Sequence, residues 1–141
     1  MQQNKIHFGR LKFLYLYTII GAGGFGLGII FMPDLVRSLL RMPVQDPVTF
    51  GITGGVYLAF GILSIFGLKS PLKFVPVLFL QLLYKTIWLI GVILPLLLKG
   101  QLQLYGILIT VIFLTYIIAD LFSIPFGYLF SSVDENELTH V

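Results

Sequence analysis

The chain has 141 residues, of which 57% are hydrophobic and only 11% are charged, whereas soluble domains carry roughly 25% charged residues. This composition excludes an ordinary soluble domain and indicates a protein embedded in a membrane. The net charge of +3 comes from Lys and Arg residues scattered between apolar segments, a pattern that excludes a basic nucleic-acid interface, and the absence of cysteine excludes disulfide and thiol chemistry.

The first apolar segment, residues 13–32, follows the positively charged Lys5, Arg10 and Lys12. Positive residues before an apolar run, with small residues at its end, are also features of a secretory signal peptide. Here the apolar character continues as far as Met32, which is too long for such a peptide. We therefore expect a retained transmembrane helix.

A short amphipathic segment, residues 34–42, follows Pro33. Leucine, valine and methionine side chains form one side of it, while Arg37 and Arg41, four residues apart, share the other. The pattern predicts a short helix that lies in the membrane interface. This helix is either a simple connector or a contact for lipid headgroups or a partner.

Three further apolar segments cover residues 49–68, 74–98 and 102–130. Each reaches the roughly 20 residues that cross a hydrocarbon core about 30 Å thick, and Pro95 and Pro125 are expected to kink or end their helices. The sequence therefore predicts an all-α, polytopic membrane protein. It is a single bundle of four transmembrane helices, with a short interfacial helix between the first two and a polar tail over 131–141.

The positive residues also predict an orientation. One side of the membrane receives Lys5, Arg10, Lys12, Lys69 and Lys73, and the other receives Arg37, Arg41 and Lys99. Because Lys and Arg favour the cytoplasmic side, we expect both termini in the cytoplasm, with the chain in a bacterial inner membrane.

Glycines concentrate in the first two predicted helices. Small residues four positions apart let transmembrane helices approach closely. The pattern predicts a tight pair formed by these two helices, with Gly24, Gly28, Gly51 and Gly55 at the contact.

Lys85 lies near the middle of the third apolar segment. A charge at this depth costs about 2.5–3.5 kcal/mol on insertion scales, so such a residue usually faces the bundle interior with a partner. If helices three and four form an antiparallel hairpin, Asp120 lies within about two residues of the level of Lys85. We therefore expect a Lys85–Asp120 pair, with Gln81 one turn away on the same face.

Further polar and aromatic side chains follow the same helical faces at spacings of three, four and seven residues. The predicted polar cluster comprises Lys85, Asp120, Gln81, Tyr57, Ser64, Trp88, Tyr116 and Ser123. Three interpretations stay open. The pair fixes helix packing, or it forms a functional pocket, or Lys85 alone extends to the membrane surface.

Catalytic and metal-binding patterns are not apparent in the sequence. Both histidines, His7 and His140, lie in the terminal segments, and no intramembrane carboxylate pair accompanies Lys85. We expect no metal site and, on balance, no enzymatic activity.

The segment Met32-Pro33-Asp34-Leu35-Val36, followed by Asp46-Pro47 and by Gly54-Gly55-Val56-Tyr57-Leu58-Ala59-Phe60-Gly61-Ile62, resembles DoxX-like small bacterial membrane proteins. The resemblance covers mainly residues 20–70. It implies a four-helix fold, and a membrane thiosulfate:quinone oxidoreductase is associated with DoxX itself. It assigns no catalytic residue to this chain.

The leading hypothesis is a non-enzymatic inner-membrane protein whose polar pocket binds or transports a small amphipathic molecule. A first alternative is a structural or accessory subunit of a membrane complex, in which Lys85 and Asp120 fix helix packing. A second is a quinone-handling redox subunit or intramembrane enzyme, in which quinone would be the cofactor. The expected partners are membrane lipids and either a second copy of the chain or another membrane subunit.

Overall fold

A computed structural model describes residues 5–132. The acidic residues of the predicted tail and His140 lie outside this range. Within it, the chain is helical and contains four helices long and apolar enough to cross a membrane, at Phe8–Phe31, Pro47–Lys69, Val75–Leu98 and Leu104–Ser123. The predicted all-α, four-helix, multi-pass membrane architecture is confirmed.

The first and third spans are each interrupted by a π turn. The first span comprises α1 (Phe8–Thr18), the π turn η1 (Ile19–Gly23) and α2 (Gly24–Phe31). The third comprises α5 (Val75–Trp88), the π turn η2 (Leu89–Ile93) and α6 (Leu94–Leu98). Single π turns inside α-helices are frequent at functional sites. Here η2 ends two residues before Pro95, near which the helix was expected to be irregular.

The second and fourth spans are continuous helices, α4 (Pro47–Lys69) and α7 (Leu104–Ser123). The last predicted segment was too long, because α7 ends at Ser123 and the backbone is extended at Ile124, before Pro125. A residue that precedes proline is disfavoured in helical geometry. The short α8 (Phe126–Leu129) follows this break.

The short helix predicted between the first two spans is present as α3 (Pro33–Leu40). Val36 is buried and Leu40 is half-buried, whereas Leu35 and Leu39 are exposed. The buried side of α3 joins Ile29 and Phe50 in a small apolar cluster. This cluster holds α3 against the ends of α2 and α4.

The turns at this end carry recognisable capping residues. Asp46 precedes α4, and its Oδ2 accepts a hydrogen bond of 2.8 Å from the backbone N–H of Thr49. This hydrogen bond lowers the pKa of Asp46, because it stabilises the carboxylate. Gly100 follows the end of the third span, and its φ of 65° suits the left-handed position after a helix.

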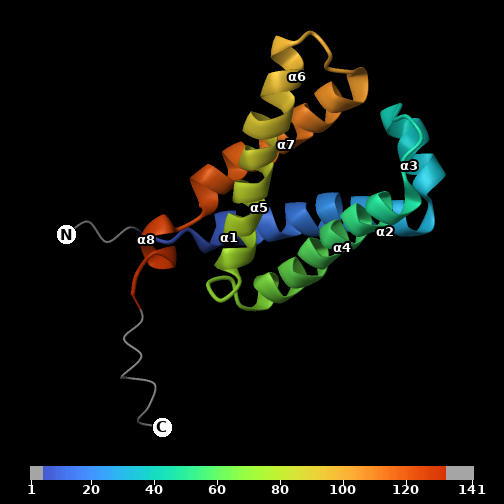
Figure 1. Ribbon diagram of the computed structural model, residues 1–141. Helices are drawn as coiled ribbons and strands as arrows, with labels where there is room; N and C mark the ends of the chain where they lie inside the picture. The colour runs from blue at the N-terminus through green and yellow to red at the C-terminus, as the bar shows by residue number, and fades with distance from the viewer. Residues whose placement is uncertain (1–4, 133–141) are drawn as a thin grey trace.

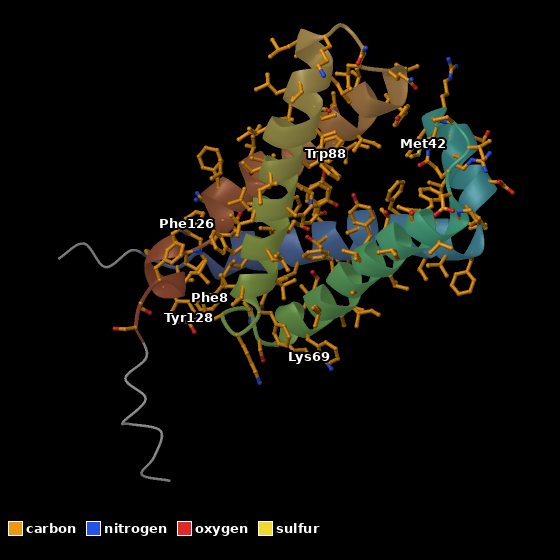
Figure 2. The ribbon with its side chains drawn as sticks, viewed as in Figure 1. Phe8, Met42, Lys69, Trp88, Phe126 and Tyr128 are labelled. Atoms are coloured by element: carbon orange, nitrogen blue, oxygen red, sulfur yellow. The ribbon has the colours of Figure 1, made fainter. Side chains whose placement is uncertain are left out.

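The spans diverge from one end of the bundle. Figure 1 shows α5 and α6 running across the pair formed by the first span and α4, with α3 at the far end of that pair and the α6–α7 turn at the far end of α6. At the opposite end a buried apolar cluster closes the bundle, and this closed end contains Leu11, Leu14, Tyr15, Val75, Leu78, Leu82 and Ile124. Figure 2 shows Phe8, Phe126 and Tyr128 together near this end and Met42 far from it.

The predicted tight pairing of the first two spans is confirmed, but it uses other glycines. A Cβ atom at Gly24, Gly51 or Gly55 would meet nothing within 4 Å. A Cβ atom at Gly26, by contrast, would lie 2.7 Å from the carbonyl oxygen of Gly54. These glycines therefore allow two backbones to touch, whereas three of the four predicted ones lie off the contact.

Gly61 and Gly28 also differ from the predicted contact between the first span and α4. A Cβ atom at Gly61 would lie 2.6 Å from the Cα atom of Gly23, so these glycines also face each other across the pair. Gly28, the fourth predicted glycine, would meet Val36 of α3 at 2.8 Å rather than α4. The helix faces were mispredicted because several small-residue spacings coexist in the sequence and only packing selects among them.

Candidate functional site

A cavity of about 160 Å³ lies where the two helix pairs diverge. We call it the Lys85 cavity. Its wall is formed by Gly21, Ala22, Phe25, Leu40, Tyr57, Tyr84, Lys85, Ile109, Ile112, Phe113 and Tyr116. All four spans and α3 contribute to this wall, and η1 supplies Gly21 and Ala22, so the cavity exists only in the folded bundle.

Lys85 is the one charged residue on this wall and is only 1% exposed. Its Nζ donates a hydrogen bond of 2.9 Å to the hydroxyl of Tyr84. The same atom lies 4.5 Å from the ring centroids of Tyr84 and Tyr116 and 5.1 Å from that of Phe113. Ring faces attract a cation within about 6 Å, and the side chain does not extend to the membrane surface.

Asp120 is fully buried beside a neutral relay of hydrogen bonds. Nε2 of Gln81 donates to Asp120 Oδ1 at 3.2 Å, while Oε1 of Gln81 lies 3.3 Å from the hydroxyl of Thr18. That hydroxyl is also 2.9 Å from the carbonyl oxygen of Leu14. Thr18, Gln81 and Asp120 thus link α1, α5 and α7, and all three are 0% exposed.

The predicted direct Lys85–Asp120 pair is wrong in its geometry. The salt bridge found within residues 5–132 joins Arg37 and Asp34 of α3 at 2.9 Å. Gln81 contacts Asp120, and Lys85, one turn further along α5, turns toward Tyr84 and the aromatic rings. Hairpin register predicted the matched depth of the two charges but not the rotation of their side chains.

Two of the three predicted aromatic residues, Tyr57 and Tyr116, line the cavity. Tyr116 stacks on Tyr17 with ring centroids 4.1 Å apart and donates a hydrogen bond of 3.0 Å to the backbone carbonyl of Tyr17. Tyr57 lines the wall and meets Phe25 edge to face at 5.4 Å. These contacts hold the rings that surround Lys85.

Trp88 reaches the cavity only indirectly. It lies behind Phe113, with ring centroids 5.0 Å apart in an edge-to-face arrangement. Figure 2 shows it on α5, where that helix runs close to α7. Trp88 is the single tryptophan of the chain, which makes it a natural reporter for this region.

The two predicted serines do not join the hydrogen-bonded relay. Ser64 is fully buried in α4, and its Oγ has no partner within the described part of the chain. Ser123 is half-buried at the end of α7 and is not on the cavity wall. Helical spacing selected their faces but could not predict their hydrogen-bond partners.

Sequence reasoning missed Thr18, Tyr84 and Phe113. Phe113 shares a face with Tyr116 and Asp120 at spacings of three and seven residues, so helical periodicity could have found it. Thr18 is the one serine or threonine in residues 13–32, and no polar spacing marks it. Tyr84 directly precedes Lys85 and is therefore rotated by about 100° around the helix axis, yet its long side chain brings its hydroxyl to Nζ.

The arrangement offers hydrogen-bond donors and ring faces rather than a metal site. No group of three or more His, Cys, Asp or Glu side chains gathers within residues 5–132. No match to the chain is found among protein-family models, curated proteins or solved structures. The chemistry of the Lys85 cavity is therefore the basis for any statement about function.

Proposed function

We propose that this protein binds a small amphipathic molecule in the Lys85 cavity, within the membrane. The observation that carries the proposal is the single ammonium group on an otherwise apolar and aromatic wall. Nζ has three N–H donors, and it makes one hydrogen bond, to Tyr84, within the described part of the chain. Two donors are left for a ligand that brings a hydrogen-bond acceptor.

The size of the cavity limits the ligand. A volume of about 160 Å³ is close to the roughly 150 Å³ of an engineered apolar cavity that holds benzene. The ring faces of Tyr84, Phe113 and Tyr116 around Lys85 suit a flat ring or a short chain. We therefore expect a ligand with one ring-sized apolar body and one acceptor group.

The wall reaches the lipid-facing surface. Ile112 lines the cavity and is 46% exposed, and Leu40 of α3 lies on the side toward the diverging helix ends. A ligand dissolved in the bilayer would enter between α2 and α7. Such a lateral route suits an amphipathic molecule, which partitions into the membrane before it binds.

The proposal keeps the predicted setting, a bacterial inner membrane with both termini in the cytoplasm and a DoxX-like four-helix fold. In this orientation the cavity opens toward the outer half of the membrane. The absence of native cysteine makes Ser70→Cys and Gln101→Cys, both at exposed turns, unique labels. An impermeant maleimide should label Gln101→Cys in intact cells and Ser70→Cys only in opened cells, and the reverse pattern would contradict the orientation.

A binding titration tests the pocket itself. Benzamide and benzenesulfonate each join a single ring to an acceptor group, and either one bound in the cavity should change the fluorescence of Trp88. Lys85→Met should weaken binding about tenfold or more, because a hydrogen bond to a charged group contributes about 1.5–3 kcal/mol.

The matched control for this titration is Thr86→Val. Thr86 is the neighbour of Lys85, its hydroxyl bonds to the carbonyl of Leu82, and it is not on the cavity wall. Binding in this variant should equal that of the wild type. The proposal fails if neither probe binds, or if Lys85→Met binds as tightly as the control while remaining folded by circular dichroism.

The two alternatives make different predictions in the same assay. A purely structural or accessory subunit binds neither probe. A quinone-handling subunit is favoured by the aromatic rings of Tyr57, Tyr84, Phe113 and Tyr116 around one cation. It would bind a short-chain benzoquinone in preference to benzamide and benzenesulfonate.

A further inference from the structure

We propose that the ligand of the Lys85 cavity is an anion and that it binds together with one proton, which Asp120 takes up. This inference rests on the proposed function, because it names the class of molecule that the cavity accepts. The amphipathic ligand then carries an acidic group such as a carboxylate or sulfonate on a ring-sized apolar body.

The first argument for an anionic ligand comes from the positions of the two buried ionisable residues. Lys85 lies on the cavity wall, whereas Asp120 is fully buried and is not part of that wall. A ligand therefore reaches the cation without reaching the carboxylate. Because the two side chains do not form a direct salt bridge in the described part of the chain, an anion can bind Lys85 without breaking one.

Charge balance carries the second step. In its ionised form, the empty site holds one cation, Lys85, and one carboxylate, Asp120. An anion bound to Lys85 would leave two negative charges beside one positive charge in a poorly solvated interior, and an unpaired buried charge is costly. Uptake of one solvent proton by Asp120 restores neutrality: the anion and a proton enter, and the complex holds a Lys85–anion pair and an Asp120 carboxylic acid.

The relay beside Asp120 suits both protonation states, which is the third step. The amide of Gln81 has donors and an acceptor, so it donates to a carboxylate and, after its amide turns over, accepts from a carboxylic acid. The hydroxyl of Thr18 is equally adaptable, because it accepts from the turned amide while donating to the carbonyl of Leu14. An arginine in place of Gln81 would hold Asp120 permanently ionised.

The other titratable groups near this region are hydroxyls and one amine. Tyrosine hydroxyls already carry their proton at neutral pH, so Asp120 is the base that can accept one. The helices around the Lys85 cavity contribute the following titratable side chains: Lys85 and Tyr84 of α5, Tyr116 of α7, Tyr17 of α1 and Tyr57 of α4.

The test uses benzenesulfonate, which keeps its charge, so any proton taken up goes to the protein. The full chain, in a neutral detergent, is titrated by calorimetry in two buffers of different ionisation enthalpy. We expect up to one proton bound per anion and an affinity that falls as the pH rises between about pH 6 and 8. Because histidines also titrate there, the background carries His7→Gln and His140→Gln.

Asp120→Asn should bind benzenesulfonate with no proton uptake and with an affinity independent of pH. Infrared difference spectroscopy of the unsubstituted chain provides a second measurement that needs no variant. Binding should produce the C=O stretch of a buried carboxylic acid, since the probe itself has no carboxyl group.

Three results would overturn the inference. They are anion binding without proton uptake, proton uptake that persists in a folded Asp120→Asn variant, and absence of the carboxylic acid band. If benzamide alone binds at Lys85, the ligand is neutral; the inference then fails and the proposed function stands. If no ring-sized probe binds, both fail.

Discussion

A single methyl group added at Gly26 should separate the first span from α4. The new Cβ atom would lie 2.7 Å from the carbonyl oxygen of Gly54 and 2.9 Å from Cα of Leu58, whereas carbon atoms in contact prefer about 3.5–4.0 Å. Both opposing atoms belong to the backbone, so no rotamer change relieves the clash. Overpacking of this kind costs about 1–3 kcal/mol.

Gly24→Ala is the matched control for Gly26→Ala. Its Cβ atom would meet nothing within 4 Å, and alanine is favoured over glycine in a helix by about 0.5–1 kcal/mol. Because the helical preference for alanine applies to both variants and cancels, Gly26→Ala should be less stable than Gly24→Ala by about 1–3 kcal/mol, the cost of overpacking. Reversible unfolding by SDS in mixed micelles, followed by circular dichroism, measures the difference.

A third variant, Gly54→Ala, should show an intermediate loss of stability. At Gly54 a Cβ atom would meet side-chain atoms of Ile29, at 2.6 Å and 2.8 Å, and a side chain relaxes more easily than a backbone. Gly54→Ala should therefore fall between Gly26→Ala and Gly24→Ala. Equal free energies of unfolding for Gly26→Ala and Gly24→Ala would refute the backbone contact and the packing faces described above.

Two further predictions concern buried and exposed carboxylates. Gln81→Met should lower the free energy of unfolding by about 1.5–3 kcal/mol, since it leaves Asp120 without its hydrogen-bond donor. In double-mutant cycles with Asp120→Asn, the coupling energy should be larger for Gln81 than for Lys85. The opposite order would indicate a direct Lys85–Asp120 pair. Asp46→Ala should destabilise α4 at neutral pH. Because the pKa of Asp46 is lowered by its hydrogen bond from Thr49, the stability that Asp46 contributes is present above about pH 4 and lost as the pH falls below that value. Unfolding of wild type and Asp46→Ala across this range should converge in acid, and a constant difference would contradict the cap.

The sequence by itself determined what lies in the membrane and at what depth. Hydropathy predicted the four spans because lipid-facing helices must be apolar over about 20 residues, and Pro125 marked the end of α7 because the residue before a proline resists helical geometry. The constant rise of 1.5 Å per residue placed Lys85 and Asp120 at similar depths. The burial of both charges followed from the cost of exposing them to lipid.

Only the tertiary structure decided which way each helix face turns. The first span touches α4 at Gly23 and Gly26 rather than at Gly24 and Gly28. One reason is that the π turn η1 lies within this span, and one extra residue in a turn rotates the following side chains by about 100° around the axis. No apolar pattern marks such a turn, because lipid accepts every face of an apolar helix.

The contacts of Lys85 depended on rotation in the same way. Its depth was set by position in the chain, but its contacts with Tyr84 and three ring faces rather than with Asp120 depended on how α5 and α7 face each other in the bundle. The Lys85 cavity is therefore a property of the assembled bundle, while the charge at its wall was visible in the sequence.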